Sequence, residues 1–102
     1  MPVMFILEVT YTAPAERVDA LLPDHVAWLD EHYAAGAFLA SGRKNPRDGG
    51  VILATAPDRA AVEALIADDP FVTGGVGTYR ITEFYATKTA PALDGYREQL
   101  PG

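Results

Sequence analysis

The sequence contains no cysteine, and this absence excludes several kinds of chemistry. The chain cannot form a disulfide, use a thiolate nucleophile or bind a metal through cysteine. Small secreted domains are commonly stabilised by disulfides, and residues 1–5 lack the basic segment that opens a signal peptide. We therefore expect a cytoplasmic protein.

Basic residues are also scarce: 8 of the 102 residues are Lys or Arg, against 14 acidic residues, so the net charge is -6. An acidic chain is repelled by nucleic acid and by anionic membranes. Its apolar runs are much shorter than the roughly 20 residues that span a bilayer. We expect neither nucleic acid nor a membrane as a partner.

Hydropathy patterns divide the chain into alternating strands and helices. Residues 3–11 alternate between apolar and polar, which predicts a strand. A helical pattern runs from about residue 15 to residue 35 and ends at Gly36, and Pro23 predicts a kink or a break inside it. The other predicted elements are strands at 38–41, 51–56 and 79–86, a helix at 57–68 that Pro70 ends, and a helical turn or docking arm within the tail.

The order β-α-β-β-α-β is typical of the ferredoxin-like fold, an α+β arrangement in which a four-stranded antiparallel sheet carries two helices on one face. The length predicts a single domain over residues 1–102, with a core at about 3–86 and a C-terminal tail at 87–102. The uncovered sheet face predicts a homodimer, although scattered apolar residues on a solvated face are a common alternative. The residues expected on that face are Met4, Ile6, Phe84 and Ala86, mixed with Glu8, Thr10, Arg80 and Thr82.

Helical spacing predicts that the two helices bring a histidine and a carboxylate together. His25 falls near the middle of the apolar stripe that contains Leu22 and Leu29. Asp69, four residues after Leu65, lies on the apolar stripe of the second helix, at an end where the macrodipole disfavours a carboxylate. Because both helices pack on one sheet face, we expect His25 and Asp69 to meet and to satisfy each other.

Other polar residues give weaker signals. His25 and His32 are two helical turns apart, too far to share one metal ion, and no other ligand pattern is present. No nucleophile-elbow motif supports Ser41 as a nucleophile. The segment "GRKNPRDGG" is either an anion-recruiting rim or a solvated loop. Aromatic residues that either line a pocket or belong to the core are Trp28, Tyr33, Phe71, Tyr79 and Tyr85.

Two segments, "LPDHVAWLDEHYAAGAFLASG" and "DDPFVTGGV", resemble the YciI-like (YCII-related) family. The resemblance implies a dimeric α+β barrel and a His–Asp dyad, carried over to His25 and Asp69. It also matches Ser41-Gly42 to the small residue and glycine that end a family strand. Leu22 stands where many members carry arginine, and Arg43 replaces another common residue, so an arginine that holds an anionic substrate would have moved.

We therefore expect a small cofactor-independent enzyme in which His25 transfers a proton on a small anionic or cyclic organic molecule. Asp69 would fix the tautomer of His25 and stabilise the imidazolium. We expect a lyase or an isomerase, with a hydrolase as an open alternative, and the resemblance adds a dehalogenating role. Neither a metal nor a cofactor is predicted. The alternatives are a non-catalytic dimeric ligand-binding module and a cofactor-free oxygenase. The predicted substrate contacts are Ser41, Gly42, Arg43 and Phe71.

Overall fold

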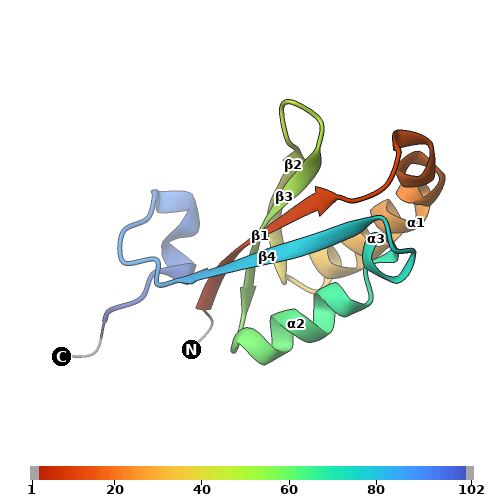
Figure 1. Cartoon of the computed structure of the whole chain (residues 1–102). Helices are drawn as coiled ribbons and strands as arrows, with labels where there is room; N and C mark the ends of the chain where they lie inside the picture. The colour runs from red at the N-terminus through yellow and green to blue at the C-terminus, as the bar shows by residue number, and fades with distance from the viewer. Residues whose placement is uncertain (1–2, 101–102) are drawn as a thin grey trace.

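The computed structural model describes residues 3–100 and contains one four-stranded antiparallel sheet with strand order β2-β3-β1-β4 (Figure 1). The predicted α+β fold is thus confirmed. The central strand has the clearest alternation, because its inward side chains Phe5, Leu7 and Val9 are all buried. The strands are β1 (Val3–Tyr11), β2 (Phe38–Arg43), β3 (Gly49–Ala56) and β4 (Gly77–Phe84).

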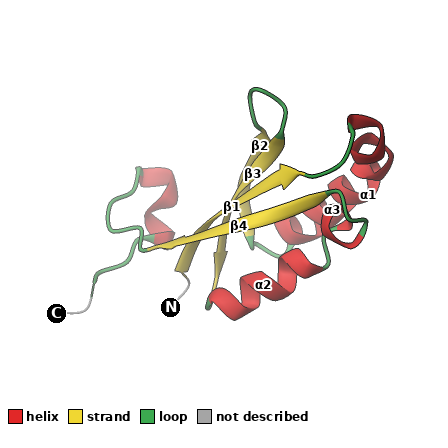
Figure 2. Cartoon of the chain, viewed as in Figure 1, coloured by secondary structure: helices red, strands yellow, loops and turns green. Residues whose placement is uncertain are grey.

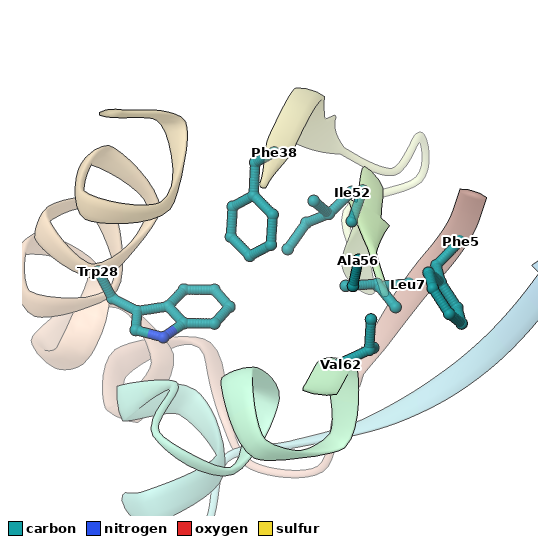
Figure 3. Close-up of a cluster of buried hydrophobic side chains, with 8 residues drawn as sticks. Phe5, Leu7, Trp28, Phe38, Ile52, Ala56 and Val62 are labelled. Carbon is teal, nitrogen blue, oxygen red and sulfur yellow. The ribbon is translucent and has the colours of Figure 1, made fainter. Parts of the chain in front are cut away.

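The two longest helices, at residues 15–34 and 59–67, pack on one face of this sheet (Figure 2). Figure 3 shows Trp28 of the first helix and Val62 of the second pointing toward Ile52 and Leu7 of the sheet. This cluster is the main core, so burial of apolar side chains fixes both helices relative to the strands. The helical elements are α1 (Ala15–Ala34), α2 (Arg59–Ala67), α3 (Pro70–Thr73) and a 3-10 helix, η1 (Pro91–Tyr96).

Helix α1 continues through Pro23, so of the kink or break predicted there, the break is wrong. Proline removes one backbone donor and crowds one carbonyl, but Val18 and Trp28 on either side of it are both buried and anchor the two halves. The predicted end of the helix is confirmed. Gly36 follows the C-cap with φ of 81°, a left-handed conformation that favours glycine.

The hairpin between β2 and β3 is tighter than the sequence predicted, because both strands extend toward the turn. β3 begins at Gly49, where a Cβ atom would lie only 1.8 Å from the carbonyl oxygen of Val9. The backbones can approach this closely only without a side chain. The last strand is also shifted, starting at Gly77 and ending at Phe84 rather than at residue 86.

The C-terminal tail folds back on the chain, and the expected helical turn is present as η1. The Glu98 amide donates a hydrogen bond of 3.0 Å to the carbonyl of Ala86. Ala86 and Met4 are buried, so these two are not exposed on the open sheet face as predicted, whereas Ile6 is 39% exposed. Residues 1–2 and 101–102 of the predicted domain lie outside the described residues. Within residues 3–100, no helix is long and apolar enough to cross a membrane.

Candidate functional site

The predicted meeting of His25 and Asp69 is present in the structure. Nδ1 of His25 lies 2.7 Å from Oδ1 of Asp69, and both residues are buried, at 8% and 0% exposure. His25 comes from the middle of α1, and Asp69 from the junction between α2 and α3. The contact therefore joins two elements that are 44 residues apart in the sequence.

The local setting of Asp69 differs from the prediction. Helix α2 is capped by Asp68, and Asp69 is instead the N-cap of α3, where its Oδ1 accepts a hydrogen bond of 3.0 Å from the Phe71 amide. An aspartate followed by Pro70 at the first helical position is a favourable start for a helix. Asp69 directly follows the C-cap of α2, as the sequence predicted, but the sequence did not predict α3, whose N-terminus favours a carboxylate at this position.

Tyr79 of β4 completes the surroundings of Asp69, since its hydroxyl donates to Oδ2 at 2.5 Å. Burial, together with the negative charge of Asp69, raises the pKa of Tyr79 far above its ordinary value, so Tyr79 stays a donor. A carboxylate that accepts from Phe71 and Tyr79 is also an acceptor for the imidazole. Nδ1 of His25 then carries a proton, and Nε2 is the basic nitrogen of the neutral ring.

The ring of His25 is held on both sides by aromatic groups. Phe71 stacks on it with centroids 3.9 Å apart and planes at 8°, and the Trp28 ring lies 5.6 Å away. His32 packs instead against the rings of Trp28 and Phe38, with centroids 5.2 and 5.1 Å away. Stacking and the Asp69 bond together limit the ring to one orientation.

A cavity of about 150 Å³ lies beside His25, and its wall contains all four residues predicted to contact substrate. Ser41 bonds to the Tyr33 hydroxyl at 2.6 Å rather than to His25, so no Ser-His-Asp nucleophile is assembled. The wall also contains Tyr79 and Arg47, together with the apolar residues Val9, Leu22, Val26, Leu29, Val51 and Ile52.

The sequence predicted Tyr79 only as an aromatic residue of a pocket or of the core, and its hydrogen bond to Asp69 was not predicted. The available signal was strand alternation, which places Tyr79 and Ile81 on the same side of β4. Within residues 3–100, no group of three or more acidic or histidine side chains is arranged to hold a metal ion. The cavity has a mainly apolar lining, and His25, Arg43 and Arg47 are among the residues of its wall.

The profile of the YCII-related domain matches residues 4–85, and the chain belongs to this family. Comparison of the sequence with curated proteins gives no match. Among solved structures, a 5-chloro-2-hydroxyhydroquinone dehydrochlorinase from Burkholderia phenoliruptrix, in complex with 2,5-dihydroxybenzoquinone, is 15% identical, with a TM-score of 0.67 over 79% of this chain and 92% of its own. SnoaB, a cofactor-independent oxygenase from Streptomyces nogalater, is 18% identical, with a TM-score of 0.51 over 88% and 97%. At these identities, both similarities show a shared fold and nothing more.

Proposed function

We propose that this YCII-related domain is a small cofactor-independent enzyme in which His25 transfers a proton on a small organic molecule. The observation that carries this proposal is the Asp69–His25 hydrogen bond of 2.7 Å at the wall of a cavity. Asp69 orients the ring through Nδ1 and stabilises the imidazolium, which leaves Nε2 as the nitrogen that accepts a proton.

The reaction class that suits this arrangement is an elimination or an isomerisation. In an elimination, Nε2 takes a proton from the substrate and a leaving group such as chloride departs with its bonding electrons. In an isomerisation, the same proton returns to another carbon. The dehydrochlorinase that shares the fold supports the first of these at the level of analogy. We favour a lyase or isomerase and place its substrate contacts at Ser41, Gly42, Arg43 and Phe71.

A non-catalytic ligand-binding module is the second candidate. Asp69 accepts hydrogen bonds from three protein donors, on His25, Phe71 and Tyr79, and a buried carboxylate with a purely structural role would have the same contacts. In that case the bond would hold the α1–α3 junction together, and the cavity would bind a small molecule without changing it.

A substrate screen separates these candidates. Chlorinated and non-chlorinated hydroxybenzenes would be incubated with the protein, with chloride release and isomer formation as readouts. We expect His25→Gln to lower turnover by about 100-fold or more, in the range of a general base, and His32→Gln to keep it. Turnover that is equal in both variants would contradict proton transfer by His25. Oxygen consumption would identify the oxygenase alternative.

We further propose that the protein is a cytoplasmic homodimer that pairs through the open sheet face. The cysteine-free sequence supports the compartment. Ile6 and Val51, which are 39% and 37% exposed, lie on neighbouring strands of this face, beside Leu53. A domain of this size gains additional apolar burial when such a face is covered by a second copy.

A further inference from the structure

Charge is distributed unevenly around the cavity. The chain has a net charge of -6, yet within residues 3–100 the charged or titratable groups that line the cavity are Arg43, Arg47, His25 and two tyrosines, without any Asp or Glu. Asp69 contacts this site only from behind His25 and Tyr79. We infer that the cavity binds a single-ring organic anion, whose charged group is held by Arg43 and Arg47.

Arg47 is positioned but not saturated. One of its terminal nitrogens donates to Asp19 at 2.6 Å, and its guanidinium carbon lies 5.8 Å from the centre of the Tyr11 ring. Its Nε is buried and has no hydrogen-bond partner among residues 3–100. A buried donor without an acceptor is unfavourable, and an anion in the cavity is a group that could draw this guanidinium into a complete set of bonds.

Arg43 provides the less neutralised charge. It lies two residues after Ser41 on β2, which places both side chains on the same side of the strand. Within the described part of the chain it forms no ion pair, whereas the neighbouring Lys44 is held by Glu8 and Asp48 at 3.2 and 3.4 Å. A guanidinium binds a carboxylate through two parallel hydrogen bonds, which makes arginine well suited to this role.

The size of the cavity suits a small ring. Its volume is about 150 Å³, and an apolar cavity of about the same volume in another protein holds one benzene molecule. The apolar residues Leu22, Leu29 and Ile52 line the same cavity as the two arginines and His25. This assignment rests on the proposed function, because both use the same cavity. The substrate class is then one planar ring with one anionic substituent.

Isothermal titration with benzoate and its neutral counterpart benzamide tests this assignment. We expect benzoate to bind about 10-fold or more tighter than benzamide, as expected for one charge-assisted interaction. We expect Arg43→Gln and Arg47→Gln each to weaken benzoate binding by about 5-fold or more. The control Arg59→Gln removes an arginine that pairs with Glu63 on α2 and does not line the cavity, so benzoate binding should be unchanged.

Three results would overturn the inference: equal affinity for benzoate and benzamide, no benzoate binding up to about 10 mM, or benzoate affinity in both cavity variants equal to that of Arg59→Gln. The titration is independent of turnover. Arginine-dependent benzoate binding without turnover in the substrate screen would refute the enzyme and retain the anion site. Turnover that needs His25 together with any of the three overturning results would refute only the anion site.

Discussion

Asp69 is the residue on which the site depends, because it accepts hydrogen bonds from an imidazole, a backbone amide and a phenol at once. Each donor comes from a different part of the fold: α1, α3 and β4. A carboxylate accepts all three without conflict, whereas a carboxamide has one acceptor oxygen and must direct its own N–H groups at the other partners.

Asp69→Asn should change the tautomer of His25. We expect the neutral ring to shift from the form protonated at Nδ1 toward a mixture, because the acceptor that selects this tautomer is partly lost. Nitrogen-15 chemical shifts of the imidazole measure the two forms directly. Asp68→Asn is a matched control on an exposed neighbour. Identical imidazole spectra in wild type and Asp69→Asn would contradict the role assigned to Asp69.

Tyr79→Phe should lower the free energy of unfolding by about 1.5 to 3 kcal/mol, the usual range for a hydrogen bond to a charged group. The change removes only the hydroxyl that donates to Asp69. Urea denaturation measures the effect, and Tyr85→Phe, at a side chain that is 50% exposed, serves as the control. An equal, small effect of both substitutions would mean that the Tyr79 bond contributes little.

Alkaline pH should destabilise the wild type more than Tyr79→Phe. The pKa of Tyr79 is raised in the folded protein, chiefly by burial, so the unfolded chain releases this proton more easily. The stability due to the neutral phenol is present below the unfolded pKa of about 10 and is lost as pH rises above it. The free energy of unfolding, measured by denaturation between about pH 9 and pH 11, should therefore fall less steeply with pH in Tyr79→Phe than in the wild type.

At the scale of single residues, the sequence predicted the contact between His25 and Asp69 but not the third partner, Tyr79. The His25–Asp69 contact follows from the helical spacing of Leu22, Leu29 and Leu65, which needs only the two helix patterns. The Tyr79 bond depends on the register between β4 and β1, where Tyr79 lies opposite Val9. Register is set by cross-strand packing and not by the pattern of one strand.

At the scale of elements, the errors of prediction occur where tertiary packing overrides local signals. Pro23 was expected to kink or break α1, yet the helix is not broken there, because the buried residues on both sides keep it continuous. The short helix α3 was missed because Asp69-Pro70 was taken to end a helix and not to start one. The strands around the β2–β3 hairpin were underestimated because glycines have no side chain from which to predict burial.

Gly49→Ala should be strongly destabilising, by at least about 3 kcal/mol, because the added methyl group would overlap the Val9 carbonyl and force β3 away from β1. The matched control is Gly42→Ala on the other arm of the hairpin, where a Cβ atom would meet nothing within 4 Å. Thermal unfolding monitored by circular dichroism measures both. Similar melting temperatures for the two variants would show that the strands separate easily at Gly49.

At the scale of the whole molecule, the sheet has one face covered by helices and one open face. The order of elements was enough to predict this, because right-handed crossovers place both helices on the same side. The open face could be predicted only in part: Met4 and Ala86 are buried in the structure, and only the fold shows that the tail returns to Ala86. That residues 1–102 act as a single domain stays a prediction.

The open face should mediate self-association. Sedimentation equilibrium of the full chain should give twice the mass of one 10.9 kDa chain. Ile6→Lys should shift the protein to monomer, because it places a charge at the centre of the face, on β1 opposite Leu53 and Thr82. Leu100→Lys changes an equally apolar, 58% exposed side chain in the tail and should leave the mass unchanged. A monomeric wild type would contradict the dimer, whereas a dimer that tolerates Ile6→Lys would place the interface on another surface and leave the open sheet face exposed to solvent.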